Sequence, residues 1–227
     1  MGFAAAAPSM LPPGSYELMC RDLAWSFSKQ TPVPLQALSC VRLVGLLFAR
    51  PKTSFGAAEI VPSFRYYHQR SGNHINFYCA GFELGWDLAT ASDADVLAAY
   101  SDYEFDKFRC EIESRSKWRY SGGADLLLAN ARFDGVEAEL DFSSMISANL
   151  VKMKSDAAID SVDSFFEQIF QYAEVQDGTD PTWGFSDSRG KSLVPSALKS
   201  LLISLLPEGL RADTKKAFHF VVSDFSL

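Results

Sequence analysis

Residues 64–83, which read FRYYHQRSGNHINFYCAGFE, hold two of the three histidines of the chain beside an arginine. His68, Arg70 and His74 could together hold a phosphate or carboxylate, because arginine binds such groups through two parallel hydrogen bonds and imidazoles also donate. The alternative is structural: Arg70 binds helix-terminal carbonyls or an acidic neighbour, and His74 begins a strand. Position favours the alternative, since ligands of open α/β sheets bind beyond the carboxyl ends of strands.

A second candidate anion site lies in ARPKTSFG, residues 49–56, which leaves the carboxyl end of an expected strand and runs towards a helix start. Arg50, Lys52, Thr53 and Ser54 could meet an anion there together with helix amides. The stretch lacks the glycines of the phosphate-binding loop, and its alternative is a solvated turn. The candidate ligand-binding residues are therefore Arg50, Lys52, Arg70 and His74.

No catalytic constellation appears in the sequence, which contains no H-E-x-x-H, G-x-S-x-G or G-x-G-x-x-G motif. The carboxylates of DGTD and Asp187 lack the spacing of a calcium-binding loop. We therefore assign no catalytic residue, no metal site and no cofactor, and we leave open whether the chain is an enzyme.

The four cysteines, Cys20, Cys40, Cys79 and Cys110, form no C-x-x-C pair and no zinc-finger spacing with a histidine. This usage is typical of an intracellular protein with reduced thiols. Cys79 alternates with Phe77 and Ile75 in a strand pattern. We interpret it as a small buried apolar residue rather than a nucleophile.

The composition excludes some classes of function. The chain has 227 residues, a formal net charge of −7 and dispersed basic residues, which argues against non-specific binding to nucleic acid or an anionic membrane. The first residues, MGFAAAAPSMLPPG, have no cationic segment of a secretory signal, and Ala6 stands where myristoylation needs Ser or Thr. No apolar stretch approaches the roughly 20 residues needed to cross a bilayer. We expect a cytoplasmic protein.

Hydrophobic periodicity predicts the main elements. Residues 41–49 and 74–82 have the apolar runs of strands, and the region from about Phe55 to His68 has helical spacing, interrupted by Pro62. Strand, helix and strand within such a short distance form a βαβ unit with parallel strands. The other expected helices begin at Ser15, run from Asp93 to about Ser116, and cover residues 156–174 and 195–209. A terminal strand is expected in residues 216–225.

The segment DLLLANARFDGVEAELDF predicts a β-hairpin, because Asp134-Gly135 suits a two-residue turn with positive φ at both positions. Counting outward from this turn pairs Phe133 with Val136 and Ala131 with Ala138. The apolar side chains then share one face, and Arg132 lies opposite Glu137 on the other.

These elements predict an α/β fold, a three-layer sandwich around a mixed sheet of about five strands. Across residues 41–175 their order resembles the thioredoxin-like arrangement in topology only. The redox members of that family carry C-x-x-C after the first strand, where this chain has ARPKTSF, and a cis-proline before the strand that here begins DLLLA. The resemblance therefore implies no thiol-redox activity.

The expected organisation is a loose start over residues 1–14 and one α/β domain over 15–227. Within it we place an N-terminal helix and connector in 15–40, the core in 41–175, a long loop in 176–194, and a helix and strand in 195–227. We expect a non-enzymatic interaction or regulatory module that acts through a protein partner or self-association as a homodimer. The alternative is an enzyme or sensor that binds a small anionic ligand containing phosphate or carboxylate.

Overall fold

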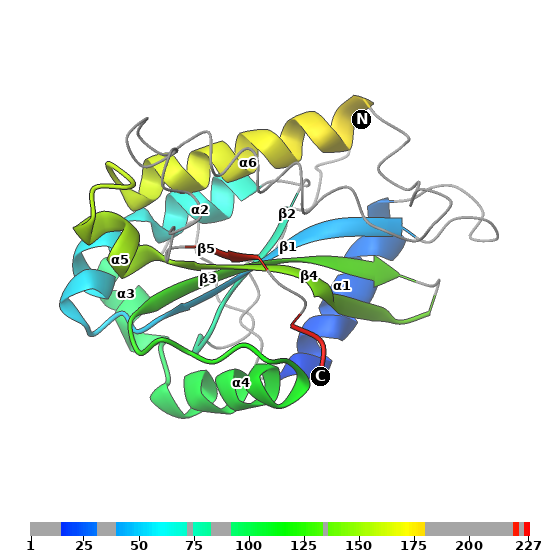
Figure 1. Cartoon of the computed structure of the whole chain (residues 1–227), viewed down its shortest axis with the longest axis horizontal. Coiled ribbons are helices and arrows are strands. Elements are labelled where there is room, and N and C mark those ends of the chain that lie inside the picture. The colour runs from blue at the N-terminus through cyan, green and yellow to red at the C-terminus, as the bar shows by residue number, and fades with distance from the viewer. Residues whose placement is uncertain are drawn as a thin grey trace.

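The computed structural model describes residues 15–30, 40–71, 75–82, 92–133, 136–179, 220–222 and 225–227, which form a mixed sheet with helices (Figure 1). The five strands of this part of the chain lie in the order β2-β1-β3-β4-β5. Their bounds are β1 Cys40–Ala49, β2 Ile75–Cys79, β3 Ala124–Phe133, β4 Ala138–Asn149 and β5 Phe220–Val222. Strands β1 and β2 are parallel and the other neighbouring pairs are antiparallel. The predicted α/β fold with a mixed five-stranded sheet is confirmed.

Helices lie on both sides of the sheet, with α2 and α6 on one side and α1 and α4 on the other (Figure 1). The helical bounds are α1 Tyr16–Gln30, a π-helical turn Gly56–Ile60, a 3-10 turn Val61–Ser63, α2 Phe64–Ser71, α3 Asp93–Ala98, α4 Asp102–Arg115, α5 Leu150–Ser155 and α6 Val162–Thr179. Residues 1–14 and 180–219, with the expected start, most of the expected long loop and the expected helix 195–209, lie outside the described residues. The sandwich, the thioredoxin-like order and the single domain stay predictions.

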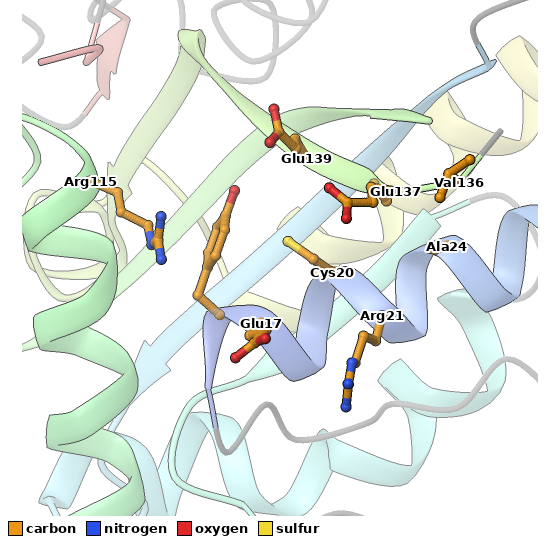
Figure 2. A pocket seen from close by; sticks show the side chains of 10 residues that line it. Glu17, Cys20, Arg21, Ala24, Arg115, Val136, Glu137 and Glu139 are labelled. Atoms are coloured by element: carbon orange, nitrogen blue, oxygen red, sulfur yellow. The ribbon is translucent and has the colours of Figure 1, made fainter. Parts of the chain in front are cut away.

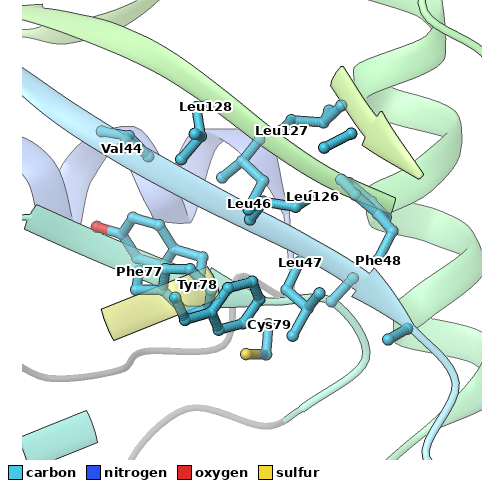
Figure 3. Close-up of a cluster of buried hydrophobic side chains, with 14 of the residues drawn as sticks. Val44, Leu46, Leu47, Phe48, Phe77, Tyr78, Cys79, Leu126, Leu127 and Leu128 are labelled. Carbon is cyan, nitrogen blue, oxygen red and sulfur yellow. The ribbon is translucent and has the colours of Figure 1, made fainter. Parts of the chain in front are cut away.

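Strand β1 lies at the centre of the core, because every residue from Leu43 to Ala49 is buried (Figure 3). On one side of the strand the ring of Phe48 stacks at 5.5 Å on Phe108 of α4 and lies 4.7 Å from Trp118. Such an unbroken apolar run is typical of a strand that is covered on both faces. Burying one such phenylalanine stabilises the fold by roughly 1.5–3 kcal/mol.

Strand β2 carries the other half of the aromatic core. Phe77 packs against two rings of α6, Phe166 at 5.3 Å and Phe170 at 5.9 Å between centroids, and against Tyr67 of α2 at 6.2 Å. Cys79 is 5% exposed, which confirms that it is a buried apolar residue. The register pairs Gly45 of β1 with Phe77, and the parallel βαβ unit predicted from the sequence is confirmed.

The prediction of one long helix from Asp93 to about Ser116 is wrong, because this segment forms two helices, α3 and α4. Ser92 caps α3, and the side chain of Ser101 caps α4 by accepting from the amide of Glu104. Between them the amide of Ser101 donates to the carbonyl of Gly81 at 2.7 Å, and Tyr100 forms a bridge with Phe82. This tertiary pairing draws the backbone out of the helix where periodicity alone predicted continuity.

The hairpin between β3 and β4 is confirmed, but its predicted register is wrong: by two residues beside the turn, and by more beyond an irregularity between Asn130 and Leu128. Phe133 pairs with Ala138 rather than Val136, and Arg132 lies opposite Glu139 rather than Glu137. The connection between paired positions is therefore longer than a two-residue turn. Side chains alternate along a strand, so a shift of two residues keeps the apolar set on the same face, and the pattern could not distinguish the two registers.

The helical segments at Pro62, α5 and α6 differ in detail from the elements predicted from the sequence. Pro62, which interrupts the helical spacing in the sequence, lies in the first turn of a 3-10 helix and marks a change of helical geometry before α2. Helix α5, capped by the side chain of Asn149, was not predicted. Helix α6 begins at Val162 and extends through Thr179 into the segment expected to be a loop.

The close approach of β1 and β2 gives a first prediction. A methyl group at Gly45 would lie 2.5 Å from Cδ2 of Phe77, so the Gly45→Ala variant must displace a ring packed against α6. We expect its free energy of unfolding in urea to fall by about 1–3 kcal/mol, the usual cost of overpacking. In a Phe77→Leu background the same substitution should cost less, and an equal cost in both backgrounds would contradict the clash.

Candidate functional site

The structure places Arg50 and Lys52, the two basic residues of the first candidate site, at the carboxyl end of β1 against helix α4. Arg50 Nη1 donates to Asp102 at 2.6 Å and Nη2 to Asp106 at 2.8 Å, while Lys52 Nζ lies 3.2 Å from Asp102. The guanidinium of Arg50 also lies 4.3 Å from the ring centroid of Phe105. Both cations are therefore held by side chains of α4.

These contacts continue along the helix as a chain of alternating charges. Arg109 donates to Asp106 at 3.1 Å and to Glu113 at 2.7 Å, and the other oxygen of Glu113 accepts from the amide of Tyr120. We call this set the α4 ion ladder; its members are Lys52, Asp102, Arg50, Asp106, Arg109 and Glu113. It ties the end of β1 to α4 and to the turn that follows that helix.

The ladder holds its carboxylates in the charged form. Partial burial pushes the pKa of Asp106 upward, but hydrogen bonds from Arg50 and Arg109 outweigh it and lower the pKa below 3.8. The pKa of Asp102 is lowered in the same way, with hydrogen bonds from Lys52 and Arg50 outweighing burial. An external anion at Arg50 must therefore compete with two carboxylates that are already ionised.

Backbone groups of the same turn also have hydrogen-bond partners. Thr53 Oγ1 donates to the carbonyl of Arg50 at 2.8 Å and accepts from the amide of Gly56 at 3.0 Å. Gly56 approaches so closely that a Cβ there would lie 2.1 Å from the Arg50 carbonyl oxygen. The Gly56 amide that an anion could have used thus already has an acceptor, and the segment forms the local turn that the alternative interpretation expected.

Arg70, from the second candidate site, lies near the end of α2 and binds Glu167 of α6. Its Nε lies 3.0 Å from each carboxylate oxygen of Glu167, and Tyr66 also donates to that carboxylate. The structural interpretation of Arg70, an acidic neighbour, matches this contact. His74 lies outside the described residues. Arg50 and Arg70 bind carboxylates of different helices, and the structure does not bring the two candidate groups into one site.

A hollow of about 470 Å³ lies elsewhere, between α1, the end of α4 and the start of β4 (Figure 2). Helix α1 lines it with Tyr16, Cys20 and Arg21, helix α4 with Arg115, and the chain entering β4 with residues 136–139. In Figure 2 Arg115 extends from the left towards the hollow, and Glu137 and Cys20 face each other across it. Charged and apolar groups therefore line the same cavity.

A second hollow of about 320 Å³ adjoins the first and shares Arg115 and Glu139 with it. It follows β4 from Glu139 to Ser143 and is also lined by Ser226 and Leu227. These two residues are held in place by Phe225, whose amide donates to the carbonyl of Phe142 and whose carbonyl accepts from Lys117. We call the two hollows together the edge groove.

The edge groove contains no activated nucleophile among the residues that the structure describes. Burial raises the pKa of the Cys20 thiol to about 11, so the thiol stays protonated near neutral pH. Burial likewise raises the pKa of Tyr16, whose hydroxyl accepts from the amide of Leu140 at 3.3 Å and whose ring lies 4.4 Å from the Arg115 guanidinium. These groups are suited to contact rather than to covalent catalysis.

Sequence reasoning missed the edge groove, because its parts come from segments far apart in the chain. From the sequence, Tyr16 and Cys20 fall in the expected helix that begins at Ser15, and Arg115 falls in the expected helix from Asp93 to about Ser116. A local signal does exist: acidic residues alternate at Glu137, Glu139 and Asp141 beside a turn. Such alternation at the end of a strand indicates a charged, exposed edge.

No family model, curated protein or solved structure matches this chain. Among the described residues, no three His, Cys, Asp or Glu side chains are grouped so that they could hold a metal ion. The helices in the described ranges are too short or too polar to cross a membrane.

The ion ladder gives a second prediction. The Arg50→Gln variant loses two ion pairs, and we expect its free energy of unfolding at pH 7 to fall by about 1 kcal/mol. Because Asp102 and Asp106 have lowered pKa values, their stabilisation is present above the ordinary value of 3.8 and is lost as the pH falls through the lower values of the folded state. The difference from wild type should therefore shrink below that pH.

Urea unfolding across this pH range measures the effect, with Lys52→Gln as the matched control. Lys52 is more exposed and makes one ion pair, so its replacement should have a smaller effect. A loss in Arg50→Gln that stayed constant well below pH 3.8 would assign the stabilisation to the contact with Phe105 instead of the ion pairs.

Proposed function

We propose that this chain is a non-enzymatic interaction or regulatory module that acts through a protein partner. The observation that carries the proposal is the edge groove: a long hollow, lined by both charged and apolar groups, at a sheet edge. Surfaces that bind proteins typically combine an apolar centre with polar, charged borders. Here Tyr16, Cys20 and Ala24 supply the less polar part, and Arg21, Glu17 and Glu139 supply charge.

The exposed residues around the groove support the same proposal. Val136 at its rim is 79% exposed and Leu227 at its other end is 77% exposed, although both are apolar. Single exposed apolar residues are common, but here they lie at the two ends of one concave surface. A partner that covered the groove would remove both from water.

The basic residues that would have served an anion-binding enzyme or sensor make other contacts. Arg50 and Lys52 belong to the ion ladder and Arg70 is paired with Glu167. A ligand at either place must break ion pairs before it binds, which lowers its net gain. This contrast favours the interaction module over the anion-binding alternative.

A cytoplasmic location is part of the proposal. It is supported by the thiols of Cys20, Cys79 and Cys110, which are free in the described structure, since a reducing compartment keeps thiols in that state.

Native mass spectrometry of the protein, purified gently from its own cells, tests the proposal. We expect the chain to be retained with a second polypeptide in a fixed ratio. The Glu139→Lys variant reverses an exposed charge of the groove and should lose that partner, whereas Asp93→Lys, on α3, should keep it. A small mass excess that denaturation removes, with no second polypeptide, would instead support the ligand-binding alternative and contradict the module.

A further inference from the structure

The first half of β4 has an outer edge that no strand of the described chain covers. Strand β5 pairs with β4 from Ile146 to Ala148, and beyond it the amide of Phe225 donates to the carbonyl of Phe142. The amide of Leu140 points outward, away from β3, since it donates to the hydroxyl of Tyr16 on α1. Backbone groups of alternate residues point to the same side of a strand. The amide and carbonyl of Ala138 and the carbonyl of Leu140 therefore also face outward.

The edge groove lies beside this edge, where the hydroxyl of Tyr16 accepts from the outward amide of Leu140. Neighbouring strands are about 4.8 Å apart, and the hollows of about 470 and 320 Å³ follow β4 over its residues 138–143. Tyr16 supplies one acceptor to the edge, at Leu140. In the complex, a carbonyl group of the added strand would accept from the Leu140 amide in place of Tyr16.

The edge is also acidic. Glu137 and Glu139 are exposed at alternate positions, and Asp141 continues the row but is bound by Arg132 at 2.6 Å. Glu139 has no ion-pair partner among the residues that the structure describes. A cross-strand pair of opposite charges stabilises a sheet by roughly 0.2–1 kcal/mol. The net charge of −7 on the whole chain further favours a cationic partner.

The same row disfavours a second copy of this chain as the occupant. Two β4 edges paired antiparallel about a twofold axis would place Glu137, Glu139 and Asp141 of one copy against the acidic residues of the other. Like charges directly opposite each other destabilise a sheet. A segment with lysine or arginine at alternate positions would instead be attracted to these acidic residues.

We propose that the partner adds an extended, basic segment as a strand along the outer edge of β4, beside Ala138 and Leu140. Its alternate basic side chains lie next to Glu137 and Glu139, and its backbone bonds to the outward groups of the edge. This recognition mode, strand addition to a sheet edge, uses backbone hydrogen bonds for affinity and alternate side chains for specificity. The inference rests on the proposed function and specifies how the partner binds.

Fluorescence anisotropy with the whole chain and a synthetic probe tests the mode. The probe is a short labelled peptide in which lysine alternates with valine, and its controls are the same peptide with glutamate in place of lysine and two N-methylated forms. One form is methylated at every lysine amide and the other at every valine amide. In an extended peptide the lysine amides point to one side and the valine amides to the other, so only one of the two kinds can bond to the edge of β4. We therefore expect one methylated form to bind like the parent and the other at least tenfold more weakly. Equal binding of both forms, or of the glutamate peptide, would overturn strand addition.

Variants of the protein locate the probe. Glu139→Gln and Glu137→Gln should each weaken binding several-fold, while Asp93→Asn, an exposed acid on α3, should leave it unchanged. Tyr16→Phe removes the hydroxyl that competes for the Leu140 amide and should bind the probe at least as tightly as wild type. A tenfold loss in a folded Tyr16→Phe protein would place the peptide on the tyrosine and overturn the assignment.

The outcomes separate this inference from the proposed function. A natural partner that is retained in native mass spectrometry, but whose binding leaves the amides of β4 unprotected from hydrogen exchange, would overturn strand addition alone. If neither a partner nor the probe binds, both proposals fail. A dimer of the chain that protects the same amides would show that a second copy occupies the edge, and would also overturn the inference.

Discussion

The rest of the fold depends on the burial of strand β1 on both faces. Its even-numbered side chains, such as Phe48, pack towards α4 and Trp118, whereas Gly45 faces Phe77, which packs on α6. A strand with apolar groups on both sides is stable only if both faces are covered, so helices must return to either side of the sheet. Gly45 leaves room for the ring of Phe77, which packs against Phe166 and Phe170 of α6.

The register of β1 also determines what its last residues meet. Arg50 follows Phe48 by two positions and is directed to the same side, towards α4, where Asp102 and Asp106 lie one helical turn apart. A guanidinium with two donating nitrogens can hold both carboxylates at once. The position beyond the carboxyl end of a parallel strand, a common ligand site in α/β proteins, is therefore used here to fix the strand to a helix.

Much of the fold could be predicted from the sequence, because burial leaves a periodic trace. The run in β1, the parallel strand β2 and the existence of the hairpin depend on local patterns, and all were found. The split between α3 and α4 depends on a bond from Ser101 to Gly81, which no local pattern records. The functional residues were less predictable. Arg50 and Arg70 were chosen as candidates because arginine binds anions, but the carboxylates that bind them lie on helices that are distant in sequence.

Strand β4 shows how one feature can serve two physical requirements. An edge strand with unpaired backbone groups tends to pair with its own copies, and charged side chains along the edge are one means of preventing this. Glu137 and Glu139 meet that requirement whether or not a partner exists. A charge that repels a copy of itself attracts a strand of opposite charge, so the same two residues can prevent self-pairing and select a basic segment. The exposed position of these groups also implies that raised salt should weaken such binding, because screening acts most strongly on charges in contact with water.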